Sequence, residues 1–198
     1  MFNFKIYFMS EQTPLSLGTE DIKKLLMRYA VPAIVAMTAA SLYNMMDSIF
    51  IGHGVGALGI AGLAVTFPFI NLAAAFGSLV GVGASTLVSV KMGQKDLKSA
   101  EAVLGNVLLL NTVIGFLFMT VCLIFLDPIL YFFGASADTL PYARDYMKVI
   151  LYGNLITHIY MGLNEVMRAS GYPQRAMMAT LFAVLINGVL NALFIFVL

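Results

Sequence analysis

The stretch SLYNMMDSIFIG, residues 41–52, holds one carboxylate, Asp47, among residues that are uncharged and mostly apolar. Tyr43 precedes Asp47 by one helical turn, so both side chains would lie on one face of a helix. A phenol at that spacing can hydrogen-bond a carboxylate or share a cation with it. The alternative is an interfacial aspartate, close to Gly52, that reaches solvent or caps the next turn. The pair therefore poses a choice between cation binding and simple capping.

The composition of the chain is that of a membrane protein. It is 61% hydrophobic and 11% charged and has a mean hydropathy of +0.92, whereas soluble domains are roughly 25% charged. An ionisable group inside an apolar span costs about 2.5 to 3.5 kcal/mol, so such groups usually face a polar cavity and serve transport. This cost favours a functional role for Asp47.

Five long apolar runs predict transmembrane helices, because about 20 apolar residues cross the hydrocarbon core and the backbone there must bond internally. We place these spans at residues 25–51, 62–90, 102–126, 146–167 and 176–198. Short polar connections separate them, at residues 53–59, 91–98, 127–145 and 168–175. The predicted fold class is an all-α integral membrane protein with no soluble domain, preceded by a cytoplasmic N-terminal segment over residues 1–21.

The charges of the connections predict an orientation. Nine Lys and Arg residues fall on the side of the N-terminus and two, Arg144 and Lys148, on the other side. The positive-inside bias then places the N-terminus in the cytoplasm and the C-terminus outside. The opening MFNFKIYFMSEQ has no clean apolar segment or small-residue cleavage site, so we predict no cleaved signal peptide. The chain starts at Met1 or at Met9.

Several other motifs have structural explanations. Pro32 lies inside the first span, where it removes a helical hydrogen bond and acts as a static bend or as a hinge. Small residues at Gly77, Gly81 and Gly83 predict a face for close helix packing. Tyrosines near the outer boundary suit the headgroup level or ordinary packing: Tyr131, Tyr142, Tyr146 and Tyr152.

Few of the remaining polar residues indicate chemistry. Glu165 and Arg168 are three residues apart and predict a local ion pair. His53 and His158 have no Cys or second His at ligand spacing, so we predict no metal site. An intramembrane enzyme would need a nucleophile with a base, and no histidine has a motif-level link to a serine. We therefore predict that the protein is not an enzyme and has no cofactor.

Six short sequences, in this order and spacing, resemble the multidrug and toxic-compound extrusion (MATE) family and look closest to its DinF-like bacterial branch: SLYNMMDSIFIG, GLAVTFPFINL, VSVKMGQKDLKSAEAVLGN, FFGASADTLPYARDYM, EVMRASGYPQRAMM and LINGVLNALFIF. The resemblance covers residues 22–198. Members have twelve helices in two lobes of six, so the resemblance implies a partial N-terminal lobe over residues 22–198. We expect the sixth helix and the second lobe to be missing from an incomplete chain.

The resemblance implies an ion-coupled antiporter of the bacterial inner membrane that exports organic cations or other amphipathic compounds. It also implies a cation or proton site formed by Asp47, Tyr43, Asn187 and Asn191, with Pro32 as a hinge. Relatives commonly have a carboxylate where this chain has Asn191, which favours H⁺ over Na⁺ as the coupling ion, although Na⁺ at the Asp47 site stays possible. Without the resemblance, interhelical hydrogen bonding explains both asparagines.

Two other functions stay open. A flippase for lipid-linked precursors has a related architecture, but it would need several cations in its cavity to bind phosphate, and no Lys or Arg lies mid-span. The second is a non-transporting membrane fragment, because a site between two repeats cannot alternate its access when one repeat is absent. The predicted partners are the lipid bilayer, small amphipathic or cationic molecules and the C-terminal lobe, which transport requires. Nearly equal numbers of basic and acidic residues, 11 and 10, do not indicate nucleic acid.

Overall fold

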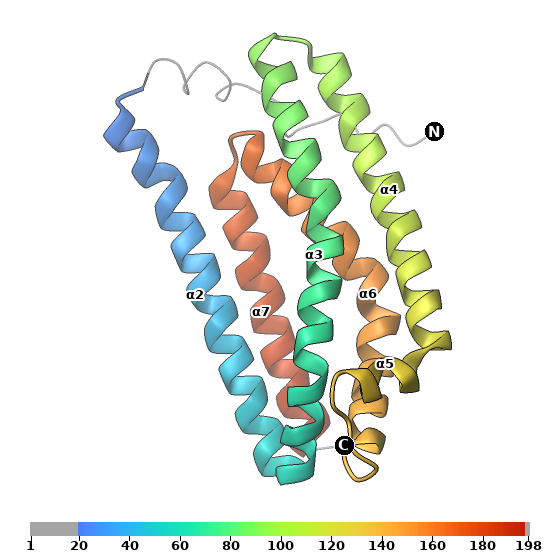
Figure 1. Ribbon diagram of the computed structural model, residues 1–198. Coiled ribbons are helices and arrows are strands. Elements are labelled where there is room, and N and C mark those ends of the chain that lie inside the picture. The colour runs from blue at the N-terminus through green and yellow to red at the C-terminus, as the bar shows by residue number, and fades with distance from the viewer. Residues whose placement is uncertain (1–19, 197–198) are drawn as a thin grey trace.

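The structure, a computed structural model, describes residues 20–196. The predicted segment 1–21, including the alternative starts Met1 and Met9, lies outside this part of the chain except for its last two residues. Within it the elements are all helices (Figure 1): α2 (Ile22–Gly54), α3 (Ala57–Gly93), α4 (Leu97–Ile124), α5 (Leu126–Phe132), α6 (Leu140–Ala169) and α7 (Pro173–Phe196).

Four of these helices are long and apolar enough to cross a membrane, namely α2, α3, α4 and the Pro173–Asn191 part of α7. The fourth predicted span, residues 146–167, lies inside α6, which has 30 residues but is too polar to be counted with the others. α6 carries Asn154 and His158 near its middle and Asn164 toward its end, and all three are buried. These polar side chains face protein, which is how a long helix can be less apolar than its neighbours.

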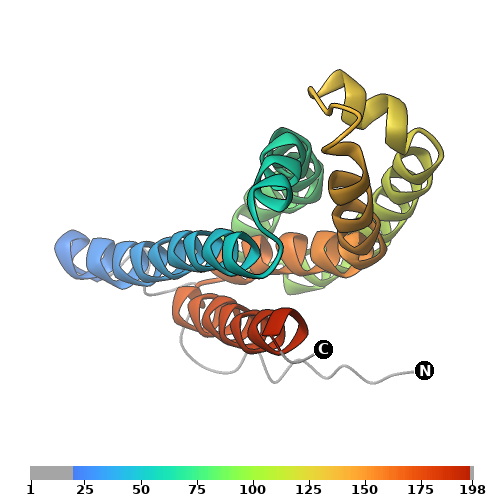
Figure 2. The ribbon, with the colours of Figure 1, turned by 90° about the horizontal axis from the view of Figure 1, so that it is seen from below.

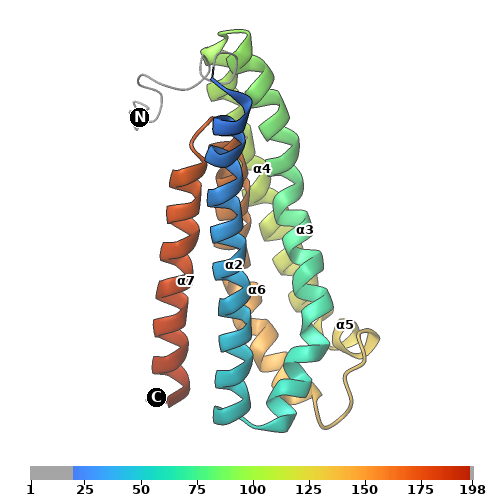
Figure 3. The same cartoon turned by 90° about the vertical axis from the view of Figure 1, so that its left-hand side faces the viewer.

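The helices form two groups. α3, α4 and α6 pack against one another, whereas α2 packs chiefly against α7. Figure 2 shows α6 between α4 on one side and α7 on the other, and Figure 3 shows α2 and α7 running side by side. The groups meet where α6 contacts α7 and where α2 contacts α3. All four predicted site residues lie in the α2–α7 pair.

The connection predicted over residues 127–145 is largely helical, so that part of the prediction is wrong. It contains most of α5 and the start of α6, which opens with Pro141 in its first turn, where the fixed φ of proline suits a helix start. Gly134, with a φ of 98°, turns the chain between the two helices. Arg144 of α6 donates to both carboxylate oxygens of Asp127 in α5. This ion pair fastens the short helix to the long one.

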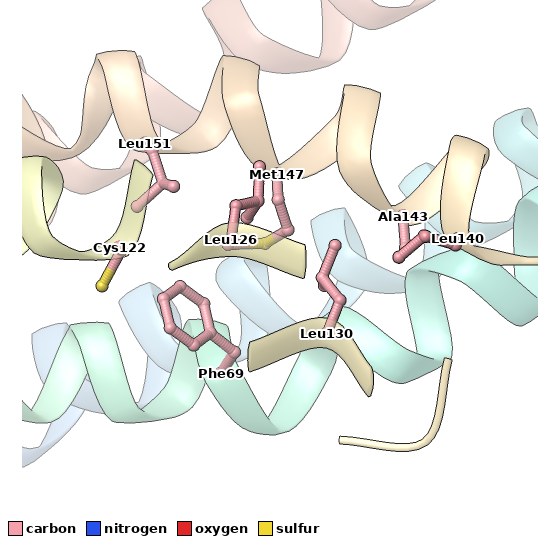
Figure 4. Close-up of a cluster of buried hydrophobic side chains, with 8 residues drawn as sticks. All are labelled: Phe69, Cys122, Leu126, Leu130, Leu140, Ala143, Met147 and Leu151. Atoms are coloured by element: carbon pink, nitrogen blue, oxygen red, sulfur yellow. The ribbon is translucent and has the colours of Figure 1, made fainter. Parts of the chain in front are cut away.

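The hydrophobic core belongs to the α3–α4–α6 group. At the end near α5, side chains from α3, α4, α5 and α6 form one cluster (Figure 4): Phe69, Cys122, Leu126, Leu130, Leu140, Ala143, Met147 and Leu151. A second cluster lies toward the other end of α3 and includes Val88, Val107 and Val166. In contrast, only Pro32 and Ile51 are buried among the 33 residues of α2. The α2–α7 pair is thus far more exposed than the three-helix group.

Small residues bring α3 and α6 close together. A Cβ atom at Gly81 would lie 2.8 Å from the Cα of Gly162, and one at Gly77 would lie 3.2 Å from the sulfur of Met161. The predicted packing face is confirmed for Gly77 and Gly81. It is wrong for Gly83, which has nothing within 4 Å of its Cβ position, because two residues along a helix point to different sides.

The long helix α2 continues without interruption through Pro32. The proline ring replaces an N–H group that would otherwise bond the carbonyl of Arg28. Gly52, His53 and Gly54 form the last turn of α2, and Gly56, with a φ of 91°, makes the turn into α3. The hinge role of Pro32 stays a prediction.

Candidate cation site

The side chains of Asp47, Tyr43 and Asn191 meet between α2 and α7. Nδ2 of Asn191 donates one hydrogen bond to Oδ1 of Asp47 at 2.6 Å and another to the Tyr43 hydroxyl at 3.1 Å. The structure therefore joins three of the four predicted site residues, although Asn191 is more than 140 residues from the other two in sequence.

The helices position this cluster simply. Tyr43 and Asp47 are one turn apart on α2, so their polar groups follow each other along one face. α7 runs beside α2 and presents Asn191 to that face. All three residues are partly buried. The cluster is thus enclosed enough to order its polar atoms, and open enough for a small ligand to reach them.

Two other predicted residues lie apart from the cluster. Asn187 is exposed, and its Nδ2 donates to the Ala183 carbonyl of its own helix at 3.0 Å. Pro32 lies fifteen residues before Asp47, which is ~22 Å along a helix with a rise of about 1.5 Å per residue. The structure gives neither residue a contact with Asp47 among the hydrogen bonds of the described residues.

Tyr146 of α6, which the sequence places with the tyrosines of the outer boundary, is a neighbour of the Asp47 cluster. It is partly buried, and it lies close enough to Asp47 and Tyr43 for their charges to act on its hydroxyl group. In the sequence, Tyr146 stands at the outer end of its predicted span, the membrane side toward which Asp47 also lies in the first span. It adds a second phenol from a third helix to the surroundings of Asp47.

The sequence matches the model of the family described as MatE over residues 32–193. This match covers most of the chain and includes the whole cluster. The chain belongs to the MATE family.

Named relatives and solved structures agree with this assignment. The Multidrug export protein MepA of Staphylococcus haemolyticus is 29% identical over 176 residues, which are 89% of this chain and 39% of the relative. An outward-facing multidrug resistance MATE transporter matches with a TM-score of 0.86 and 28% identity, over 94% of this chain and 42% of that one. A Pyrococcus furiosus transporter of the MOP superfamily matches with a TM-score of 0.85 and 28% identity, over 94% and 41%.

The chain spans about two fifths of the length of these MATE relatives. The Pyrococcus furiosus protein is described as having a binding pocket of reversed polarity that suggests a different function. Similar folds in this group therefore accommodate different pockets, and the polar residues of each chain must be considered individually.

The cluster in this MATE chain can hold one small cation. A carboxylate, a phenol and an amide supply oxygen atoms, and the amide can turn its NH₂ group toward a carboxylate or its oxygen toward a donor. Among residues 20–196, no group of three or more His, Cys, Asp or Glu side chains is placed to hold a metal ion. Asp47 is the one carboxylate among the three side chains of the cluster.

The other predicted polar residues make local contacts. Arg168 donates to Glu165 at 2.6 Å, so the predicted ion pair is confirmed. Nδ1 of His53 lies 2.9 Å from the Ile49 carbonyl, and Nδ1 of His158 lies 3.0 Å from the Asn154 carbonyl. Both histidines thus use one ring nitrogen within their own helix.

A second polar region lies inside the α3–α4–α6 group, away from the cation site. Asn111, Asn154 and His158 are at most 4% exposed. In the described part of the chain, both polar side-chain atoms of Asn111, Nδ2 of Asn154 and Nε2 of His158 have no hydrogen-bond partner. The sequence showed these residues as polar interruptions of apolar spans, but it gave no indication that they gather at one interface.

Proposed function

We propose that the protein carrying this chain is an ion-coupled multidrug exporter in which Asp47 binds the coupling ion and an organic cation in turn. The observation that carries the proposal is the joint bonding of Asn191 to Asp47 and Tyr43 between α2 and α7. The names of the relatives, multidrug export protein and multidrug resistance transporter, support the substrate class.

Exchange follows from competition for one carboxylate. A cation bound at Asp47 needs the ionised form, whereas a proton neutralises it, so the two ligands exclude each other. Asn191 can serve both states, because its NH₂ group donates to the carboxylate and its oxygen accepts from the protonated acid. Proton entry would thus release an organic cation on the outer side.

The same geometry favours H⁺ over Na⁺. Sodium would need the amide NH₂ of Asn191 to turn away from Asp47 and would meet one carboxylate with neutral oxygens. A proton needs only the carboxylate and an amide that reverses its hydrogen bond. Among the described residues, the hydrogen bonds of the cluster join one carboxylate, Asp47, to an amide and a phenol.

Direct binding to the purified 198-residue chain tests this site. Tetraphenylphosphonium, a lipophilic organic cation, should bind and release protons into weakly buffered solution near the pH at which Asp47 titrates. Asp47→Asn should abolish both signals, and Asp138→Asn, an exposed position between α5 and α6, should leave both intact. Binding without proton release, or undiminished binding to Asp47→Asn, would place the cation elsewhere.

Transport is tested in cells without their own pumps, using the protein in which this chain is joined to a second lobe. Asp47→Asn should stop efflux of a fluorescent organic cation at unchanged expression, whereas Asp138→Asn should not. Replacing H⁺ gradients by Na⁺ gradients should not restore efflux. Sodium-driven efflux by the unmodified protein would overturn proton coupling and leave the export function standing.

We further propose that the chain lies in the bacterial inner membrane with its N-terminus in the cytoplasm. Nine of the eleven Lys and Arg residues fall on the side of the membrane where the N-terminus lies, and this bias supports the orientation. Alkaline phosphatase fused after Leu198 should be active, since the fusion point would be outside. A cytoplasmic reporter that is active at that point would reverse the orientation or remove one span.

A further inference from the structure

A cavity of about 240 Å³ lies between α2, α6 and α7, toward the end of α2 opposite Asp47. Its walls include Pro32, Ala33 and Ala36 of α2, Arg168 of α6, and Met177 and Thr180 of α7. It is separate from the cation site and from the proposed exchange at Asp47.

The cavity extends along the helices. On α7 its lining runs from Pro173 to Thr180, seven steps that rise ~10 Å in a helix. On α2 it runs over the same distance, from Tyr29 to Ala36. Small side chains, Ala33 and Ala36, leave this space open between the three helices. A volume of this size and depth suits one alkyl chain rather than a bulky ring system.

The inner end of the cavity offers little to a polar ligand. The Thr180 hydroxyl lies 2.8 Å from the Tyr160 hydroxyl and donates to the Ala176 carbonyl at 3.1 Å. Nδ2 of Asn164 donates to the same carbonyl at 3.2 Å. These polar groups are therefore already bonded to one another between α6 and α7. Apart from Tyr29 and Arg168, the remaining lining residues are apolar.

Among the described residues, Arg168 is the one charged residue that lines the cavity, and it is paired with a carboxylate. Arg168 gives one terminal nitrogen to Glu165 at 2.6 Å, while its Nε is buried and has no partner among the described residues. Pro173 begins α7 and lines the cavity, so the positive end of the helix dipole points to this region. Glu20 is paired with Arg28 at 3.4 Å through one oxygen, and it does not line the cavity. The guanidinium of Arg168 is thus the group available to an incoming anion.

We propose that this cavity binds the alkyl chain of an amphiphile whose phosphate head group lies against Arg168. A guanidinium presents several N–H groups in one plane, which matches the oxygens of a phosphate, and the Arg168 side chain stays 36% exposed beside Glu165. The chain would bury apolar surface against Pro32, Ala36 and Met177. A bilayer phospholipid and a free alkyl phosphate share this chemistry.

Occupancy would act on α2 through Pro32. The proline lines the cavity at the point where α2 lacks one backbone hydrogen bond. A chain between α2 and the α6–α7 contact would support the inner side of this weak point. The ligand would thus support α2 at Pro32 without touching Asp47.

Thermal unfolding of the purified chain in an alkyl maltoside provides a test. Cys122 is the only cysteine and is buried, so a thiol-reactive fluorophore reports its exposure on unfolding. Decyl phosphate should raise the Tm saturably by a few degrees, because a ligand that binds only the folded form stabilises it. Decyltrimethylammonium, with the same chain and the opposite charge, should not.

Paired variants locate the effect. Ala36→Leu fills the cavity and should abolish the rise, whereas Ala75→Leu, exposed on α3, should preserve it. Arg168→Gln should remove the preference for phosphate over ammonium, and Lys98→Gln, an exposed cation at the start of α4, should not. Equal shifts for both head groups, or a full shift in Ala36→Leu, would overturn the proposal.

A photoactivatable alkyl phosphate makes the test independent of how the variants fold. In the unmodified chain, labels should appear on peptides that contain residues 29–36 and 173–180. Labels confined to lipid-facing peptides would overturn the site. In nanodiscs, competition by phosphatidylglycerol would identify a bilayer lipid as the occupant, and labelling that phosphatidylglycerol does not reduce would identify a free amphiphile.

Discussion

Between α2 and α7, the polar atoms of Asp47, Tyr43 and Asn191 bond to one another, and their side chains are only partly buried. Between α3, α4 and α6, Asn111 and His158 are almost fully buried, and each keeps a polar atom that lacks a partner in the described part of the chain.

This difference separates binding from packing. The α2–α7 cluster contains a carboxylate, links it to a phenol through Asn191 and is only partly buried, so it can exchange one partner for another. The α3–α4–α6 cluster has no charge to offer and is enclosed by glycine contacts, and unpaired buried polar atoms lower stability. We therefore expect substitutions in the first region to change ligand binding and those in the second to change stability.

The largest effect is expected at Gly81. Gly81→Leu would push a side chain into the backbone of Gly162, 2.8 Å from the Cβ position, and overpacking of this kind costs about 3 kcal/mol or more. Gly83→Leu is the matched control, since its Cβ position is open. Unfolding followed at Cys122 should show a much lower Tm for Gly81→Leu alone. Similar Tm values would mean that α3 and α6 are not held at close contact.

The next effect is on binding at Asn191. Asn191→Leu removes the donor shared by Asp47 and Tyr43, and hydrogen bonds to charged groups contribute about 1.5–3 kcal/mol. We expect the affinity for tetraphenylphosphonium to fall at least about 10-fold, since about 1.4 kcal/mol corresponds to that factor. Asn187→Leu is the control, because Asn187 bonds only its own helix in the structure. An equal loss of affinity in both variants would mean that Asn187 belongs to the site.

A smaller effect is expected at His158. His158→Leu removes a ring whose Nε2 has no partner among the described residues, so the one hydrogen bond lost is that of Nδ1 to the Asn154 carbonyl, which contributes about 1 kcal/mol. The Tm should change by an amount that corresponds to about 1 kcal/mol or less, with cation binding unaltered. A strong loss of stability would show that Nε2 is satisfied, for instance by a buried water molecule.

The smallest effect concerns Asp96, which caps α4 in the turn after α3. Its carboxylate accepts from the Ser99 N–H at 3.1 Å, and hydrogen bonding by Ser99 holds the pKa of Asp96 below its usual value of 3.8. Because this pKa is lowered on folding, the stabilisation is fully present above pH 3.8 and is lost as pH falls through the lowered value. The Tm difference between the unmodified chain and Asp96→Asn should therefore shrink on acidification. A constant difference would exclude the charged cap.

Local spacing made part of the site predictable. Tyr43 and Asp47 are one turn apart, so their common face follows from the sequence alone. The contact of Asp47 with Asn191 depends on how α2 lies against α7, and only the family resemblance indicated it. Asn187 is one turn from Asn191, as Tyr43 is from Asp47, but its side chain bonds the Ala183 carbonyl of its own helix. Spacing does not decide whether such a side chain bonds its own backbone or a neighbouring helix.

Hydropathy predicted the long helices better than the short ones. The apolar runs gave four helices fit to cross a membrane, whereas α5, only 7 residues long, was concealed in a polar connection. Tyr146 was assigned to the membrane boundary, because its approach to Asp47 depends on the packing of α6. Relations between distant helices are the part of this structure that periodicity cannot supply.

The polarity of α6 has a consequence for biogenesis. A segment with Asn154 and His158 in its middle gains less from partitioning into lipid than its neighbours do. Its free energy of membrane insertion therefore depends on helices that can receive those two side chains, and α3 and α4 precede it in translation and pack against it. Insertion of α6 is thus expected to be cooperative, with the earlier hairpin of α3 and α4 acting as an intramolecular chaperone for the later helix.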